Sequence, residues 1–149
     1  MHSSALGREV RQVDRLIGHY AESHRHPTNV LIHWICVPII VWCVLALLWV
    51  VHPLLAASAS VFSLGYYLRL SWQFALSMAV FAGLCLYSMT FVPHPGWVAL
   101  SLFVLTWIFQ FIGHHIEGKK PSFLEDLQYL LVGPIFLLGK LFRRLGLSY

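Results

Sequence analysis

Charged residues are scarce in this sequence. Only 11% of the 149 residues are Asp, Glu, Lys or Arg, 58% are hydrophobic, and the mean hydropathy is +0.72. A soluble domain has about 25% charged residues, so this composition excludes that class and is typical of an integral membrane protein. The net charge of +4 gives no reason to expect binding to nucleic acid, and we take it as a signal of orientation in a membrane.

Neither a cleavable secretory signal nor a cysteine framework is expected from this sequence. Residues 1–29 hold four Arg and four His, without the apolar core that a signal peptide needs. The three cysteines fall inside apolar runs, at spacings unlike those of disulfide or zinc sites. We therefore expect buried and inert thiols. These are Cys36, Cys43 and Cys85.

Two long stretches, 30–68 and 70–116, contain no charged residue. At 1.5 Å per residue they would form helices about 58 and 70 Å long, roughly twice the 30 Å hydrocarbon core of a bilayer. Each stretch has turn residues near its middle, His52-Pro53 and 92–96, so each is predicted to fold as a hairpin of two spans. The predicted spans are 33–51, 54–70, 73–91 and 97–114.

With four spans, all ten basic residues can lie on one side of the membrane. The loops on the other side would then carry no charge, in agreement with the positive-inside rule. A three-span alternative, with 54–70 as a loop, would export Lys119 and Lys120 and break this rule. The sequence therefore predicts an all-α membrane bundle whose N-terminus lies in the cytoplasm.

The N-terminal segment is predicted to form an amphipathic helix over residues 8–22. Its apolar side chains Val10, Val13, Ile17 and Tyr20 follow one helical stripe, and the arginines lie away from it. Such a helix suits either an anionic membrane surface or packing under the bundle.

The C-terminal segment, 117–149, is predicted to re-enter the membrane or to lie at its interface. Gly133-Pro134 is expected to break it, and a fifth crossing would export the cations at its end. Together, 1–29 (cytoplasmic amphipathic region), 30–116 (four spans) and 117–149 are predicted to make a single membrane domain.

Residues of ligating type gather at both ends of the four-span region. His24 and His33 lie near its start, and His114 and Glu117 near its end. Because four crossings return the chain to the side that it left, the two groups share one membrane face. Pro27 breaks the helix between His24 and His33, so their rings can converge. Ionisable groups at membrane depth are costly and tend to mark function, so the histidines are predicted to bind a divalent metal.

Several neighbouring residues have two interpretations. Glu117 is either a fourth ligand or an outer carboxylate that orients a ligating histidine. His26 and His115 either support a ligand or are simply solvated. Lys119 and Lys120 are either positive-inside charges or a site that captures a substrate carboxylate.

The residues alone leave the class of function open. The same ligands suit iron and zinc, so an oxygenase and a metal-dependent hydrolase or other lipid enzyme are both compatible with them. A haem-binding electron carrier could use paired histidines and would have a Soret band. A non-catalytic lipid-binding or scaffold protein would contain no stoichiometric metal.

Two blocks of the sequence, 20–38 and 107–134, resemble the 2-hydroxy fatty acid dioxygenases of the yeast endoplasmic reticulum and their bacterial membrane relatives. One departure is that the Glu of the second block follows its His by three residues here, and by four in the yeast-type pattern. The residues that carry the resemblance are Tyr20, His24, Asn29, His33 and Pro38, and then Gln110, Gly113, His114, Glu117 and Pro121.

The resemblance implies an enzyme of a bacterial inner membrane that depends on Fe²⁺ and uses O2. Its substrate would be a 2-hydroxy long-chain fatty acid, cleaved between C1 and C2 to an acid one carbon shorter. The acyl chain would lie among the helices, where an apolar tail partitions favourably. Tyr20 and Asn29 would hydrogen-bond around the metal site. The residues that would hold the iron are His24, His33, His114 and Glu117.

Overall fold

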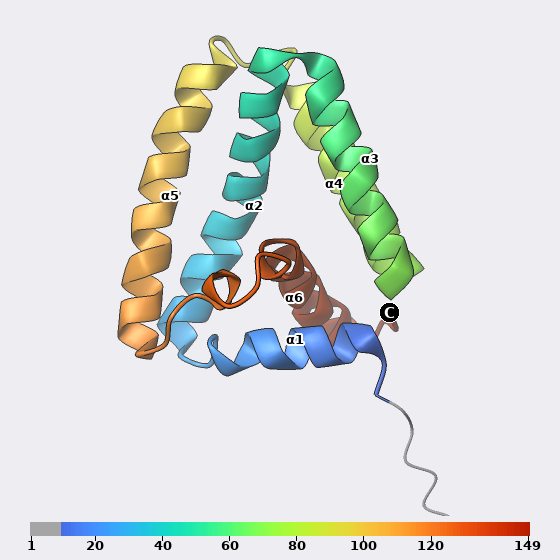
Figure 1. The fold of residues 1–149 in the computed structure, drawn as a ribbon, viewed down its shortest axis with the longest axis vertical. Helices are drawn as coiled ribbons and strands as arrows, with labels where there is room; N and C mark the ends of the chain where they lie inside the picture. Colours follow the sequence, from blue (N-terminus) through green and yellow to red (C-terminus); the bar gives the residue numbers. More distant parts are fainter. Residues whose placement is uncertain (1–9) are drawn as a thin grey trace, which may run out of the picture.

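A computed structural model of the protein describes residues 10–149, drawn in Figure 1. Within these residues there are six α-helices, one 3-10 turn and no strand, so the prediction of an all-helical fold is confirmed. Arg8, at which the predicted N-terminal helix begins, lies outside the described residues. The elements are α1 (Gln12–Glu22), α2 (Pro27–Val51), α3 (Pro53–Leu70), α4 (Trp72–Ser88), α5 (Pro95–Glu117), η1 (Ser122–Leu124) and α6 (Tyr129–Arg144).

The four long helices alternate in direction, and α1 and α6 cross their lower ends (Figure 1). α2 packs along α5, and α3 packs along α4. By length and composition, α2 and α5 could each cross a membrane, whereas α4 is apolar but has only 17 residues. The four helices overlap the four predicted spans, although α4 ends at Ser88 and not at residue 91.

Histidine and proline form the two turns at the upper end, as the sequence predicted. His52 ends α2, and its Nδ1 accepts a hydrogen bond of 3.1 Å from the backbone N–H of Leu54. Pro53 then begins α3, where its fixed φ suits the first helical turn. In the second turn His94 adopts a left-handed conformation, with φ 50°, and Pro95 begins α5.

The two shorter helices form a layer beneath the bundle. The stripe of α1 buries Val13, Ile17 and Tyr20 in a cluster that also contains the buried side chains of α6. Val10 is exposed and precedes the helix. Of the two settings predicted for the N-terminal helix, the structure therefore shows the one in which it packs under the bundle.

Gly133-Pro134 does not break the C-terminal helix, contrary to the sequence prediction. α6 continues through Pro134, which lies in its second turn. A proline there removes one backbone hydrogen bond and crowds the preceding turn. Burial of the neighbouring side chains, Val132 and Ile135 to Leu137, offsets this loss.

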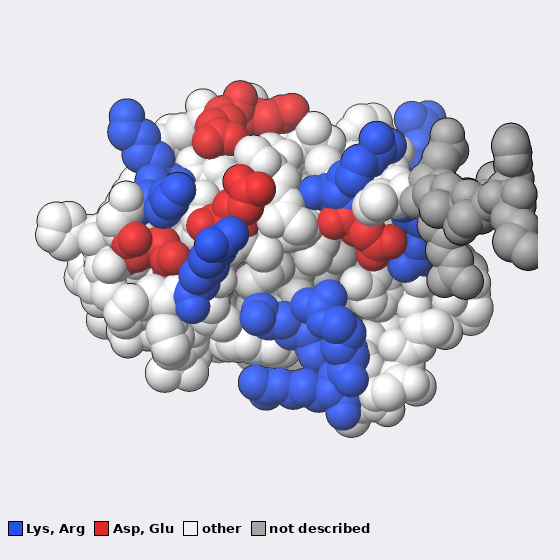
Figure 2. All heavy atoms as spheres, turned by 90° about the horizontal axis from the view of Figure 1, so that it is seen from below, with Lys and Arg blue, Asp and Glu red and all other residues white. Residues whose placement is uncertain are grey.

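Charged side chains gather on the lower face of the molecule. Figure 2 shows this face, with Lys and Arg as well as Asp and Glu spread over the ends of the helices. Above this face, most of α2 to α5 is formed by the stretches 30–68 and 70–116, which contain no charged residue. The face that holds the charges is also the face where the two histidine groups meet.

Candidate metal centre

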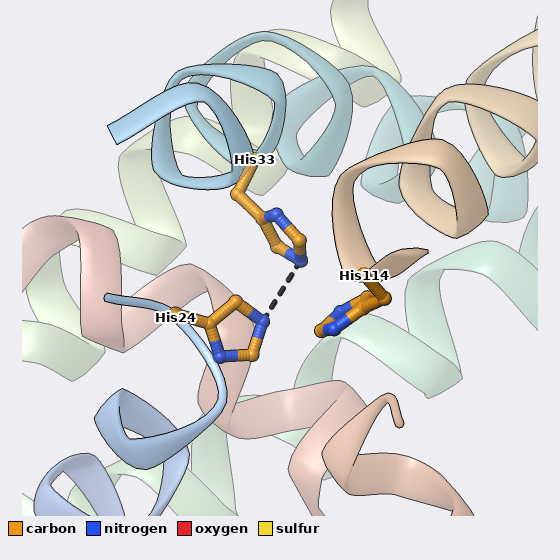
Figure 3. Close-up of side chains that lie close together, drawn as sticks. All are labelled: His24, His33 and His114. Carbon is orange, nitrogen blue, oxygen red and sulfur yellow. Dashed lines mark hydrogen bonds between the residues drawn. The ribbon is translucent and has the colours of Figure 1, made fainter. Parts of the chain in front are cut away.

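Three histidines from distant parts of the sequence meet near the lower ends of α2 and α5 (Figure 3). His24 lies between α1 and α2, His33 in α2 and His114 in the last turn of α5. All three are at most 5% exposed. One ring nitrogen of each lies within 4.8 Å of the others, and among the described residues this is the one group of three His, Cys, Asp or Glu placed to hold a metal ion. The predicted convergence is therefore present.

Local sequence explains how His24 folds back toward His33. α1 ends at Glu22 and α2 begins at Pro27, so a short connection carries His24 between two helices of different direction. His26 caps α2, because its Nδ1 accepts a hydrogen bond of 3.2 Å from the backbone N–H of Thr28. The proline and the cap together fix where α2 starts.

Backbone carbonyls fix the tautomers of two rings. His24 Nδ1 lies 2.6 Å from the carbonyl oxygen of Tyr20, and His33 Nδ1 lies 2.8 Å from that of Asn29. Since a carbonyl only accepts, each Nδ1 carries the hydrogen and each Nε2 presents a lone pair. The two Nε2 atoms are 3.0 Å apart. Two lone pairs this close repel one another unless a cation lies between them.

A metal ion suits this position better than a proton. Burial, and next the charge of His33, lower the pKa of His24 from 6.5 to about 3, so the ring is neutral at pH 7. Two nitrogens that bind one ion at about 2.1 Å each are at most about 4.2 Å apart, which the 3.0 Å spacing satisfies. Donation from Nδ1 to a carbonyl is also the usual support of a ligating histidine. This pair fits a metal ion, and together with His114, whose ring nitrogen lies within 4.8 Å of both, it could hold iron or zinc.

Tyr20 supports the site through its ring and its backbone. The phenol ring stacks on His24, with centroids 3.9 Å apart and planes 7° from parallel. The Tyr20 carbonyl accepts from the same imidazole. Tyr20 thus contacts His24 through a backbone hydrogen bond and a stacked ring, and together these contacts hold the imidazole in one orientation.

The Glu117 carboxylate is directed at the connection that carries His24. Its Oε1 accepts from the backbone N–H of Arg25 at 3.0 Å, and its Oε2 from the backbone N–H of His26 at 2.7 Å. Oε2 also accepts from Asn29 Nδ2 at 3.1 Å. Glu117 is not in the three-histidine group. Of its two predicted roles, this geometry favours the outer one over direct ligation. Glu117 accepts from the backbone beside His24 and not from a histidine ring, and it ties the end of α5 to the start of α2.

α2 and α5 approach closely at Gly113. A Cβ on this residue would overlap Asn29 Oδ1 and would lie 3.3 Å from Ile32 Cδ1. Gly113 directly precedes His114, and the Asn29 carbonyl accepts a hydrogen bond from His33. The absence of a side chain at Gly113 therefore sets the distance between the helical turns that carry His33 and His114.

The other predicted site residues lie outside the cluster. His115, Lys119 and Lys120 are exposed, as is His26. None of them lines the cavity described next. For the two lysines, an exposed position is compatible with both predicted roles.

The three histidines line a cavity of about 70 Å³. Trp107, Gln110 and Ser122 also line it, and the sequence analysis gave these residues no role in the site. A signal existed for Gln110, which lies one helical turn before His114 and so faces the same side. No such signal existed for Ser122, because only the fold brings η1 to this cavity.

A larger cavity, of about 310 Å³, adjoins the first one. Both are lined by Ile40, Val41, Trp107 and Leu130. The larger cavity lies among α2, α3, α4, α5 and α6, and its walls are almost wholly apolar. A polar site and an apolar chamber are thus neighbours within one bundle.

Comparison with known proteins identifies the family of this chain. The family model described as 2-hydroxy-palmitic acid dioxygenase Mpo1-like matches residues 10–145. The chain is 30% identical over 151 aligned residues to the 2-hydroxy-palmitic acid dioxygenase MPO1 of Saccharomyces cerevisiae, covering 95% of this chain and 86% of the yeast protein. No solved structure matches the chain. The resemblance predicted from the two sequence blocks is confirmed, and the chain belongs to the Mpo1-like family.

Proposed function

We propose that this protein is an iron(II)-dependent dioxygenase that cleaves 2-hydroxy long-chain fatty acids between C1 and C2. The observation that carries this proposal is the convergence of His24, His33 and His114 beside an apolar cavity. The yeast relative is named for 2-hydroxy-palmitic acid, which supports the substrate class. Bound Fe²⁺ would supply the redox chemistry that lets O2 react with the substrate.

The proposed reaction balances without an external reductant. The substrate R–CH(OH)–COOH and one O2 give R–COOH, CO2 and water. The bond between C1 and C2 breaks, C2 is oxidised from an alcohol to a carboxylic acid, and C1 leaves as CO2. O2 accepts the electrons that both carbons lose.

The residues around the histidines would keep the site in shape. Backbone carbonyls hold the His24 and His33 rings with Nε2 toward the cluster. Glu117 holds the connection that carries His24, and Tyr20 packs flat against that ring. Close packing would also exclude bulk water from the reacting atoms.

The apolar cavity offers a place for the acyl chain. Each methylene removed from water contributes about 0.8 kcal/mol, so a long chain would supply most of the binding energy. Val44 of α2 lines this cavity and is 43% exposed. A lipid could therefore enter from the bilayer beside α2 without passing through water.

The proposal includes four crossings of a bacterial inner membrane by α2, α3, α4 and α5. The charged lower face in Figure 2 would then lie in the cytoplasm. The 18 residues of α3 extend about 27 Å, close to the thickness of a bilayer core. The metal site would sit at the inner membrane surface, where a carboxylate headgroup meets the polar side chains.

The test is metal analysis of protein purified without oxygen, followed by oxygen uptake with 2-hydroxyhexadecanoic acid. We expect stoichiometric iron, oxygen consumption and pentadecanoic acid detected by mass spectrometry. Hexadecanoic acid, which lacks the 2-hydroxyl, is the matched substrate control and should not be consumed. Iron without oxygen uptake would support the proposed metal site but contradict the proposed substrate. A Soret band would instead favour a haem protein.

A further inference from the structure

Unpaired polar atoms are concentrated in the histidine cavity. Among the described residues, five buried side-chain nitrogen or oxygen atoms have no hydrogen-bond partner. Four of these atoms belong to residues that line this one cavity. Native proteins leave few buried polar groups unpaired, so such a concentration points to a bound molecule. The four atoms are Trp107 Nε1, Gln110 Nε2, His114 Nδ1 and Ser122 Oγ.

Three of these groups are uncharged hydrogen-bond donors. Trp107 Nε1 and Gln110 Nε2 only donate, and the Ser122 hydroxyl can donate as well. Gln110 is 5% exposed and Ser122 is 3% exposed, so bulk water does not readily satisfy either of them. A molecule that fits these donors must present oxygen acceptors, and a carboxylate presents two oxygens.

The three donors line the histidine cavity, and one of them also borders the apolar cavity. Gln110 is one turn before His114 on α5, and Ser122 comes from η1. Trp107 lines both the histidine cavity and the larger apolar cavity. An amphipathic molecule can therefore place its oxygens on the donors while its chain extends past Trp107 between the helices.

We propose that Trp107, Gln110 and Ser122 form an uncharged subsite that binds the carboxylate of the 2-hydroxy acid beside the three histidines. This inference rests on the proposed function and deepens it. In this proposal buried neutral donors, and not Lys119 and Lys120, bind the carboxylate. The two lysines are exposed and do not line the cavity. The subsite would orient C1 and C2 toward the cluster, because the donors fix the headgroup and the apolar cavity fixes the chain.

The test compares two ligands that differ in the carboxylate. 2-Hydroxyhexadecanoate and 1,2-hexadecanediol share the chain and the 2-hydroxyl, but only the first has the carboxylate. Dissociation constants are measured by calorimetry on the full-length, metal-loaded protein without oxygen, so no turnover is needed. The variants Gln110→Met and Trp107→Phe each remove a donor and keep most of the side-chain volume.

We expect each of these variants to bind the acid roughly 10- to 100-fold more weakly, the effect typical of losing a hydrogen bond to a charged group. Binding of the diol should fall less, because its C1 hydroxyl is uncharged and accepts a weaker hydrogen bond than a carboxylate. Ser122→Ala should behave in the same way, whereas Ser122→Thr keeps the hydroxyl and should restore binding of the acid. Metal content and thermal stability identify a variant that has failed to fold.

The outcomes separate this inference from the proposed function. If wild type binds the acid but all three donor variants bind it equally well, the subsite is wrong and the proposed function stands. Equal loss of acid and diol would mean that these residues only shape the cavity, which also overturns the inference. If wild type binds neither ligand and consumes no 2-hydroxy acid, the proposed function itself fails.

Discussion

The Nε2 atoms of His24 and His33 lie 3.0 Å apart, although each ring already directs its Nδ1 at the carbonyl four residues earlier. Because each Nδ1 donates to a carbonyl, each Nε2 of the neutral rings is a hydrogen-bond acceptor. Neither can donate to the other, so the contact needs a cation. The arrangement explains why one histidine from the connection before α2 and one from α2 itself can be buried together beside a third, His114.

Replacement of His33 by Ala should abolish metal binding. Loss of an outer hydrogen-bond partner weakens metal affinity by about 10- to 100-fold, and loss of a ligand should exceed this. The measurement is metal content by mass spectrometry after purification without oxygen, together with oxygen uptake. His115→Ala is the matched control, since this exposed neighbour of His114 should retain metal. Full metal content in His33→Ala would refute the three-histidine assignment.

Replacement of Glu117 by Gln should weaken the metal site without abolishing it. The carboxylate accepts from two backbone N–H groups and from Asn29, and an amide turns one acceptor into a donor. We expect metal affinity to fall about 10- to 100-fold, measured by competition with a chelator. A complete loss like that of His33→Ala would instead identify Glu117 as a ligand.

Substitution of Gly113 by Ala should destabilise the protein and disturb the site. The added Cβ would overlap Asn29 Oδ1, so α2 and α5 must separate or Asn29 must move. Overpacking of this kind costs about 1–3 kcal/mol. Thermal unfolding and metal retention should both fall. Gly83→Ala on α4 is the control, because its Cβ would meet nothing within 4 Å and should be tolerated.

Filling the apolar cavity should shorten the preferred substrate. Ser63 lines this cavity on α3, and Ser63→Trp would occupy the space proposed for the end of the acyl chain. Each methylene that no longer fits should lower kcat/KM by about fourfold, from about 0.8 kcal/mol per methylene. Oxygen uptake with 2-hydroxy acids of ten to eighteen carbons gives the profile. Ser58→Trp, an exposed position on the same helix, should leave that profile unchanged.

The two ends of the bundle should differ in their accessibility to membrane-impermeant reagents. Thr90→Cys lies at the upper turn and Lys120→Cys on the charged lower face, and both positions are exposed. In intact spheroplasts a charged maleimide should label Thr90→Cys, and it should label Lys120→Cys only after the membrane is opened. The native cysteines are buried and should react little. Labelling of both positions from one side would exclude four crossings.

Some features of the site follow from local sequence. The apolar runs bounded by Arg69 and interrupted by prolines predict long helices that turn at His52 and His94, and the structure has its turns there. An even number of such helices returns the chain to one end, which is why His24, His33 and His114 could be expected to meet. The helix break predicted at Gly133-Pro134 is absent, because burial of the adjacent side chains outweighs the lost backbone hydrogen bond.

By itself, then, the sequence determined the helical class and the membrane-like hydropathy, and it identified the histidines, because these depend on residue types and their spacing along the chain. Only the tertiary structure decided what each polar group contacts. Glu117 meets backbone groups about ninety residues away, and Ser122 reaches the cavity through η1. Such partners depend on how closely α2 and α5 approach at Gly113, and no local pattern encodes that distance.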